Sequence, residues 1–535
     1  MTRQIAGWWS TAIVGLTVGL GAGAPAGAES VLRIGMTAAD VPTTTGMPNN
    51  GFEGMRFLGY PSFEAPIQWD LTKTDGFAGI KPALATEWKI DPQDNTKWTF
   101  VLRRGVKFHD GTDFNADAVL WNLARYYDDK SPQYDPVASS ITRARAPVFK
   151  RANKVDDYTV EMFTTQPASY FPFQAVYFLM SSPAQFAKMG NDWAKVATAP
   201  MGTGPFRVTK FVPRESVELE KNPGYWDPTR LAKVDRIVLR PIPEATTRLA
   251  ALRSGQVDWI EVPPPDAIPS LRAAGFQIMT NKYPHVWPYV FNTTGDSPFK
   301  DKRVRLAANY AVDRDGLVKL LNGTAEPAAG FLNPSDPNFG SPENKLKYDP
   351  AKAKALLTEA GYSAAKPVKA KVMISSSGSG QMLPLPMNEF IQQTLKDSWI
   401  ELDFEVVEWN TMLVAFRQPP TGPQALGSHA MNISLVSSDV STFYRWFHSR
   451  SFAPTSSNWG HWKNDQLDAV LNKIETTFDP AALGGGMRAA NEILVDDPPW
   501  LYIVHDLNPR ALSPKVKGFV QAQSWFQDLT PVRMD

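Results

Sequence analysis

Side chains that could carry out chemistry are scattered through this sequence of 535 residues. None of the six histidines has a second one at the H-x-x-x-H spacing that places two metal ligands on one helix face. The chain contains no cysteine, which excludes thiolate nucleophiles and thiolate metal ligands. His448 and His461 are the pair that folding could bring together. We expect no metal site and no cofactor.

Hydrolytic chemistry has weak support. The segment 377–380, Ser-Gly-Ser-Gly, lacks the glycine that a G-x-S-x-G nucleophile elbow needs two residues before its serine. The acidic pairs at 156–157 and 496–497 are adjacent in sequence and would point to opposite sides of a strand, which suits solvated turns. We expect a protein that is not an enzyme, with an exported hydrolase as the alternative.

Aromatic side chains are the best supply of binding surface. One ring laid on a ligand contributes a few kcal/mol, at roughly 25 cal/mol per Å² of buried apolar area. Six of them gather in the second half of the chain: Trp409, Phe443, Tyr444, Trp446, Trp459 and Trp462. Trp409 and Trp459 are the strongest candidates because each is expected at a strand end or in a loop. The competing interpretation is that most of these rings belong to the core.

The first 28 residues are typical of a secretory leader. Arg3 is their only charge, an apolar stretch follows at 8–20, and small residues stand at 26–28. We predict cleavage after Ala28 and export to the periplasm, with an uncleaved membrane anchor as the alternative. No cysteine follows the predicted cut, which argues against a lipid-anchored lipoprotein.

Charge and composition point away from polyanionic partners. The full chain has 55 basic and 54 acidic residues, and the only charge removed with the leader is Arg3, so the mature chain is balanced. A neutral surface gives no electrostatic reason to bind nucleic acid or anionic lipid. Without disulfides, core packing must stabilise the fold. We expect a monomer.

The stretch 84–123 combines strand periodicity, turn chemistry and a helix start. Trp98, Phe100 and Leu102 alternate with polar or smaller residues, as in a half-buried strand. The preceding strand around Trp88 is separated from them by the turn formers at 91–95, which predicts an antiparallel pair. Asn115 is placed to cap a following helix.

The order of residues in this stretch resembles a known family. The matching residues are Leu84, Ala85, Trp88, Trp98, Thr99, Phe100, Leu102, Arg103, Gly105, Val106, Phe108, His109, Asp110, Gly111, Phe114, Ala116, Asp117 and Val119. Together they closely resemble the extracellular solute-binding proteins of peptide/nickel-type ABC importers. The resemblance implies an α/β periplasmic-binding-protein-like clamp, in which two lobes close around a small molecule and deliver it unchanged to membrane permease subunits.

The resemblance and the alternation of strands and helices predict three domains. A strand at 32–36, a helix at 244–255 and a strand at 257–260 favour a mostly parallel sheet in lobe 1. Lobe 2 is expected to contain a helix at 302–321 and another that is capped by Asp349. The predicted limits are 29–70, 199–287 and 505–535 for lobe 1, 71–198 for inserted domain II, and 288–504 for lobe 2 (domain III).

The sequence differs from dipeptide-binding relatives at the residues that bind the two charged ends of the peptide. There an Asp pairs with the peptide's amino group, and the resemblance places Val436 at that position. No arginine lies in 382–387, where the relatives carry the partner of the carboxylate. Leaving a desolvated charge unpaired costs roughly 3–5 kcal/mol. We therefore expect a neutral or weakly charged solute, with a di- or oligopeptide receptor as the alternative.

The candidate ligand-binding residues come from several segments. In the family, the loop after the first strand borders the cleft. The full set is Thr45, Met47 and Asn50 from that loop, Asn292 after the strand 286–291, Trp409, the run Ser437, Ser438, Asp439, Phe443 and Tyr444, and Trp459. Asp439 matches the second, structural Asp of the family pattern.

Overall fold

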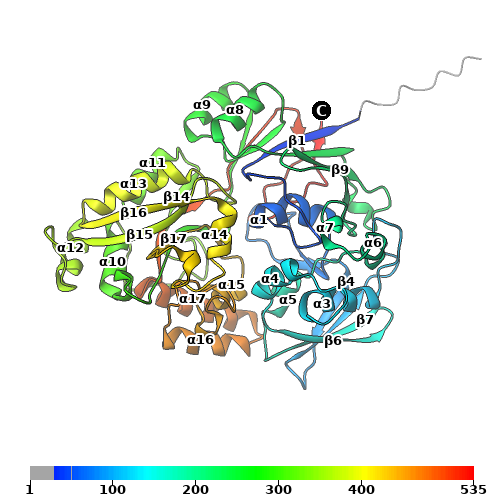
Figure 1. Ribbon diagram of the computed structural model, residues 1–535, viewed down its shortest axis with the longest axis horizontal. Helices are drawn as coiled ribbons and strands as arrows, with labels where there is room; N and C mark the ends of the chain where they lie inside the picture. Colours follow the sequence, from blue (N-terminus) through cyan, green and yellow to red (C-terminus); the bar gives the residue numbers. More distant parts are fainter. Residues whose placement is uncertain (1–28, 50) are drawn as a thin grey trace, which may run out of the picture.

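The computed structural model describes residues 29–49 and 51–535, so the predicted leader and Asn50 lie outside it. Figure 1 shows two large bodies side by side, lobe 1 with the inserted domain beneath it and lobe 2 beside them. Within the described chain, no helix combines the length and the apolar composition needed to cross a bilayer.

Lobe 1 is built on a mixed seven-stranded sheet. Its order is β12 (Gln277–Met279), β20 (Arg510–Leu512), β11 (Trp259–Glu261), β1 (Val31–Met36), β10 (Arg236–Pro241), β9 (Ser216–Lys221) and β8 (Phe206–Val212). β1 is parallel to β10 and β11, but β8, β9, β12 and β20 pair antiparallel to their neighbours. The expectation of a mostly parallel sheet is wrong. The β8–β9 hairpin adds antiparallel strands on one side of the sheet, and β20, which returns from the C-terminal part of the chain, pairs antiparallel with β11 and β12 on the other side. Two helices of lobe 1 are α8 (Ala245–Arg253) and α9 (Ile268–Ala273).

The inserted domain carries a four-stranded antiparallel sheet with helices beside it. The order is β4 (Ala85–Ile90), β5 (Lys97–Leu102), β7 (Thr159–Thr164) and β6 (Phe149–Asp156). The predicted pairing is confirmed, since Trp88 lies opposite Phe100. The helices used below are α3 (Ala116–Tyr127), α4 (Pro136–Arg145) and α5 (Phe171–Ala175). Asn115 caps α3 by accepting a 3.1 Å hydrogen bond from the Ala118 amide.

Lobe 2 holds a second mixed sheet. Its order is β14 (Ala325–Pro327), β19 (Trp500–Asp506), β13 (His285–Phe291), β17 (Ala430–Asn432), β15 (Val368–Ser375) and β16 (Ile400–Val407), with β18 (Leu435–Val436) on β13. The main helices are α10 (Lys302–Ala311), α11 (Arg314–Leu320), α12 (Pro350–Glu359), α13 (Pro384–Lys396), α14 (Trp409–Ala415), α15 (Val440–Phe447), α16 (Asp465–Glu475) and α17 (Pro480–Asp496).

The predicted helix 302–321 is two helices. Val312 leaves helical geometry at φ −86° and ψ 120°, and the Asp313 side chain starts α11 by accepting a 2.9 Å hydrogen bond from the Gly316 amide. A local capping signal therefore interrupts a continuous apolar pattern. The expected helix after Asp349 is confirmed, and it is followed by Gly361 at φ +87°, a conformation that glycine adopts most easily.

The chain passes between the lobes twice, at 280–284 and at 507–509. The crossings are tied together: the Asn281 amide donates to the Leu507 carbonyl at 2.9 Å, and the Tyr283 hydroxyl donates to Asp506 at 2.8 Å. His285 Nδ1 also hydrogen-bonds Asp506. Paired crossings of this kind form a hinge. The domain limits given above stay a prediction.

A buried ionic network lies beneath the hinge on the lobe 1 side. Glu261 pairs with Arg510 at 2.9 Å and with Arg56, and it accepts a 2.7 Å hydrogen bond from the Trp259 indole. Burial alone would raise the pKa of Glu261, but the two guanidinium groups outweigh it and hold the pKa below its usual value. The network joins the segment after β1, through Arg56, to the strands that lead into the hinge.

We expect Glu261→Gln to lower the free energy of unfolding by about 3–5 kcal/mol, because it leaves two buried arginines without their shared counter-ion. Since the folded-state pKa of Glu261 is depressed, its contribution is present at neutral pH and is lost as the pH falls through that value. Urea unfolding measures both effects. Asp113→Asn is the control, because the Lys107–Asp113 pair is exposed and should be worth less than about 1 kcal/mol. Equal losses in the two variants would contradict the network's role.

Candidate functional site

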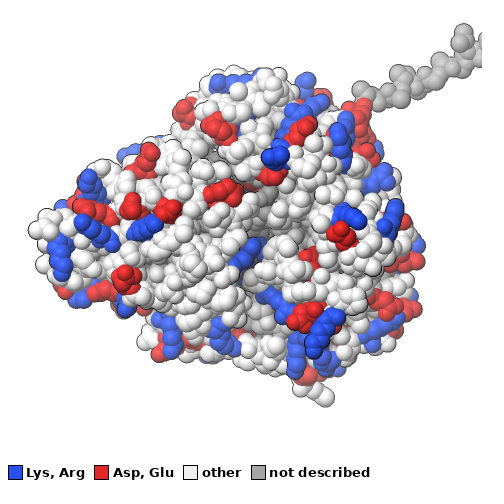
Figure 2. Space-filling model, viewed as in Figure 1, with Lys and Arg blue, Asp and Glu red and all other residues white. Residues whose placement is uncertain are grey.

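A cleft lies where lobe 1, the inserted domain and lobe 2 meet. It encloses about 660 Å³ of empty space, part of it open to solvent. Figure 2 shows this face of the molecule hollowed between the two bodies, with basic side chains along the hollow. The lining residues used below are Phe52 and Trp525 of lobe 1, Arg145 of the inserted domain, and His285, Ser379, Trp409, Phe416, Arg417, Ser434, Val436, Arg445, Trp446 and Ser457. We call this space the central cleft.

Three arginines from separate elements line the central cleft. Arg145 is the last residue of α4, Arg417 follows α14, and Arg445 lies within α15. The Arg145 guanidinium donates to the Ile141 carbonyl at 3.1 Å and the Arg445 guanidinium to Ser457 Oγ at 3.2 Å. Within residues 29–49 and 51–535, none of the three forms an ion pair, and the Arg417 side chain makes no hydrogen bond.

Burial and mutual repulsion act on these arginines together. Burial lowers the pKa of Arg445 to about 9, with Arg145 as the next cause. Burial also lowers the pKa of Arg145 to about 10 and depresses that of Arg417. With these values, the Arg145 and Arg445 guanidinium groups stay largely protonated at neutral pH. Asp439, behind the wall, partly offsets this charge, but the lining itself carries three arginines and no Asp or Glu, which favours an anionic ligand.

Aromatic rings form the apolar wall of the central cleft. Trp409, Phe416 and Trp446 come from lobe 2 and face Phe52 and Trp525 of lobe 1. The Trp409 ring rests on the backbone of Gly378, where an added Cβ would stand only 2.4 Å from the indole and where φ is +145°. Residue 378 must therefore be glycine for the Trp409 ring to occupy this position. Because these rings and the three arginines line the same space, a ligand can bury an apolar part beside its anionic group.

His285 adds a polar group at the hinge side of the cleft. Its Nδ1 is held by Asp506, and its ring stacks on Tyr283 at a centroid distance of 5.0 Å. In the described part of the chain, Nε2 makes no hydrogen bond. Because Asp506 fixes the orientation of the imidazole, Nε2 is available to a ligand.

Few of the predicted residues reach the central cleft. Trp409 lines it, as does Val436. Thr45 donates to Asp135 at 2.5 Å and is covered by the inserted domain, while Met47 is buried in the core. Asn292 closes a turn by accepting from the Thr294 amide at 2.9 Å. Asn50 lies outside the described residues.

The predicted residues of the run 437–444 and Trp459 mainly stabilise the fold. Asp439 caps α15, accepting from the Ser441 amide at 2.8 Å and from Ser438 at 2.7 Å. Ser437 pairs by its amide with the Pro284 carbonyl at 2.9 Å. Three aromatic residues complete the set: Phe443 and Trp459 are fully buried, and Tyr444 packs against the inserted domain with its hydroxyl on the Leu471 carbonyl.

The sequence does not predict the cleft arginines, because the family resemblance places the partner of a ligand carboxylate at 382–387. That segment lies before and at the start of α13, and the arginines that face the cleft lie elsewhere in the chain. The only feature of the sequence that marks these arginines is an adjacent apolar residue, such as Trp446 after Arg445 and Phe416 before Arg417. Such a pattern does not reveal which side chains lack a counter-ion.

Two serines at the cleft, Ser379 and Ser434, are held by backbone groups. Ser379 Oγ accepts from the Glu53 amide at 2.9 Å, and Ser434 Oγ donates to the Ser379 carbonyl at 2.9 Å. Across the described residues, no serine hydroxyl is hydrogen-bonded to an imidazole, and no three His, Asp or Glu side chains gather as a metal site. His448 and His461 bond different partners, Asn472 and the Ala453 carbonyl.

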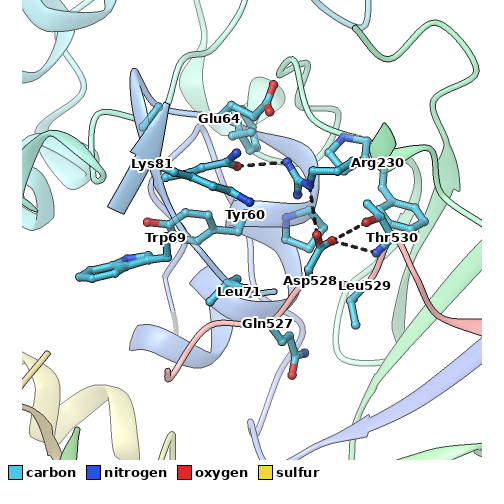
Figure 3. A pocket seen from close by; sticks show the side chains of 16 residues that line it. Tyr60, Glu64, Trp69, Leu71, Lys81, Arg230, Gln527, Asp528, Leu529 and Thr530 are labelled. Atoms are coloured by element: carbon cyan, nitrogen blue, oxygen red, sulfur yellow. Dashed lines mark hydrogen bonds and ion pairs between the residues drawn. The ribbon is translucent and has the colours of Figure 1, made fainter. Parts of the chain in front are cut away.

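A second cavity, of about 550 Å³, lies in lobe 1, and its charged side chains are already paired or hydrogen-bonded within the protein (Figure 3). Arg230 there bonds Asp528 at 3.1 Å, and Thr530 donates to the same carboxylate. Glu64 accepts three hydrogen bonds, from Tyr225, Trp226 and Thr203, which offset part of the rise in pKa that burial causes. The charged groups in this cavity already have partners, so it gives no comparable reason to bind an ion.

We expect Arg417→Gln to change the stability of the ligand-free protein by no more than about 0.5 kcal/mol, because the side chain makes no folding contact by hydrogen bond or ion pair. The matched control is Arg305→Gln. Arg305 donates to the Pro498, Phe299 and Lys300 carbonyls and to Asp497, so its loss should cost about 2–4 kcal/mol. Thermal and urea unfolding provide the measurement, and a loss at Arg417 as large as at Arg305 would assign that arginine to the fold.

Comparison with known proteins agrees with this architecture. The model of bacterial extracellular solute-binding proteins, family 5 Middle, matches residues 79–460. Glutathione-binding protein GsiB of Shigella boydii is 30% identical over 82% of this chain and 83% of its own length. Heme-binding protein A of Haemophilus influenzae is 27% identical over 86% and 85%.

Solved structures are similar over nearly the whole chain. The periplasmic binding protein DppA of Helicobacter pylori, in complex with peptide STSA, has a TM-score of 0.82 at 24% identity and covers 95% of this chain and 98% of its own. The dipeptide-binding protein of Pseudoalteromonas sp. SM9913, in complex with Met-Leu, also scores 0.82, at 23% identity and coverages of 94% and 100%. These likenesses show the fold of two lobes with an inserted domain. By its family match and its 30% identical relative, the chain belongs to the bacterial extracellular solute-binding proteins of family 5.

Proposed function

We propose that this solute-binding receptor of an ABC importer captures a small organic acid that carries an apolar or aromatic part. The observation behind this proposal is the presence of three cleft arginines, Arg145, Arg417 and Arg445, that form no ion pair in the described chain, although the buried Asp439 attracts Arg445 from behind the cleft wall. An unpaired guanidinium taken out of water is costly, and a ligand anion removes that cost. The aromatic wall would bury the rest of the ligand.

Closure of the lobes explains how binding would be signalled. Lobe 1 touches lobe 2 where the Glu53 amide donates to Ser379 Oγ at 2.9 Å and Thr37 Oγ1 approaches the Gly378 carbonyl at 3.4 Å. Closure of the lobes would also bring Arg145 of the inserted domain toward Arg417 and Arg445 of lobe 2. A ligand anion offsets their repulsion only in the closed form, so it shifts the population toward closure. The permease then recognises the closed receptor, and the solute is passed on unchanged.

The sequence predicts a neutral or weakly charged solute, and the proposed acid lies at the charged end of that range. That expectation considered only Val436 and the segment 382–387, whereas the arginines come from other elements. The peptide alternative gains a partner for its carboxylate, but the described lining of the central cleft contains no Asp or Glu for a free amino group. Relatives named for glutathione and for heme bind molecules that carry carboxylates. We favour an acid whose amino group is absent, modified or distant.

The cellular setting follows from the family and the leader together. Family 5 proteins are extracellular solute-binding proteins that work with ABC permease subunits. We propose export to the periplasm with cleavage after Ala28, and action there as a monomer. The balanced charge of the chain supports a receptor that does not bind nucleic acid.

A paired screen tests the ligand class. We expect organic acids such as glutathione, N-acetyl-phenylalanine and aromatic carboxylates to include binders, and each bound acid to bind at least about thirtyfold more tightly than its neutral amide, because the amide leaves the guanidinium groups unpaired. Isothermal titration calorimetry gives the ratio. Arg417→Gln and Arg445→Gln should reduce the ratio. Tight binding of neutral sugars or amides, unaffected by either variant, would refute an acid-binding site.

A further inference from the structure

A separate cavity adjoins the central cleft between the inserted domain and lobe 2. It encloses about 650 Å³ of empty space, also partly open to solvent, so it is comparable in size to the cleft itself. Its lining includes Gln166, Tyr170 and Gln174 of the inserted domain and Tyr444, Arg445 and Glu475 of lobe 2. We call it the side chamber.

The partition between the two spaces is thin. Arg445 lines both of them, and its guanidinium bonds Ser457 Oγ of the cleft wall at 3.2 Å. The next residue toward the chamber, Ser456, approaches the Ala144 carbonyl of the inserted domain at 3.5 Å. Side chains and one long contact therefore separate the spaces. A ligand anchored at the arginines lies next to the entrance of the chamber.

The side chamber exists because the inserted domain rests on lobe 2. The Ser169 amide donates to the Glu475 carbonyl and its hydroxyl to the Ile474 carbonyl, both at 2.9 Å. The rings of Tyr170 and Tyr444 pack at a centroid distance of 4.4 Å. The closure that completes the central cleft therefore also shapes the chamber, and a molecule spanning both would touch three surfaces.

One polar group in the chamber is left without a partner. Gln174, in α5, is only 2% exposed, and its Oε1 makes no hydrogen bond. By contrast, Glu475 Oε1 already accepts from Gln166, Arg450 and Tyr170. A buried acceptor without a donor costs free energy that the fold does not recover. The missing partner of Gln174 Oε1 is a hydrogen-bond donor, and because this oxygen is closed to solvent, a donor in the chamber reaches it when the Gln174 side chain turns toward the chamber.

We propose that the ligand of this receptor is elongated: its acid group binds at the arginines of the central cleft, and its other end passes Arg445 into the side chamber, where a hydroxyl, amide or amine donates to Gln174. This inference rests on the proposed function and deepens it by specifying the ligand's length and the chemistry of its second end. A lengthened acylated amino acid has this shape.

The probes are N-acetyl-phenylalanine and the same compound lengthened at its amino end by alanyl residues, measured by calorimetry. The chamber is altered in two ways. Gln174→Leu removes the acceptor without breaking a hydrogen bond, and Thr455→Trp fills the rim from an exposed position, so both variants should fold. Gln185→Leu is the control, because Gln185 is a similarly buried glutamine of the inserted domain with an unpartnered Oε1 outside the chamber. It also breaks the 2.7 Å hydrogen bond from Gln185 Nε2 to the Ala199 carbonyl, so a thermal unfolding measurement on each variant accompanies the calorimetry.

We expect lengthening to improve binding to the wild-type protein about tenfold, as a hydrogen bond to a buried group and added apolar contact would. Gln174→Leu and Thr455→Trp should remove this gain and leave the affinity for the short probe unchanged, while Gln185→Leu keeps the gain. No gain in the wild type, or a gain that survives in both chamber variants, overturns the side chamber alone. Failure of the short probe to bind, or binding that Arg417→Gln leaves unchanged, overturns the acid site and the chamber together.

Discussion

In the proposed function, positive charge between the bodies of the molecule links ligand binding to conformation. Arg145 belongs to the inserted domain, and Arg417 and Arg445 belong to lobe 2, yet all three line one cleft. Arg145 and Arg417 contribute to the lowered pKa of Arg445, so the groups act on one another across the gap. Without an anion, bringing the bodies together concentrates like charge. With an anion, the same three charges favour the closed form.

The hinge has a different character, since its buried carboxylates have partners within the protein. Tyr283 and His285 hold Asp506 at one crossing, and Arg56 and Arg510 hold Glu261 beneath it. The pKa of Asp506 is kept low chiefly by His285, against the effect of burial. Interactions of this kind fix the geometry of the crossings, so the lobes can move while the segments between them stay ordered.

Local signals were sufficient for much of the fold and for little of the site. The hairpin of Trp88 and Phe100, the cap at Asn115 and the helix after Asp349 follow from residues close in sequence, which is why they could be predicted. The break at Val312 and the antiparallel edges of the lobe 1 sheet depend on a competing cap and on a strand from the far end of the chain. Phe443 and Trp459 were plausible stacking residues, but periodicity does not say which buried surface a ring joins. The arginines are brought together only by tertiary structure.

Arginines elsewhere in the same chain show why the cleft differs. Arg248 donates to the carbonyls of Ile242, Pro243, Glu261 and Val262, and Arg314 donates to those of Asn309 and Tyr502. Burial depresses the pKa of both, as it does for the cleft arginines. Their donors are nevertheless used, so they stabilise the loops and strands that they connect. In the cleft the same side chain retains unused donors at a junction of three bodies. Burial therefore does not identify a binding arginine, and neither does a single unused donor, since Arg125 and Arg510 also bury one without an acceptor. The cleft arginines differ in lining a cavity between the bodies without forming an ion pair.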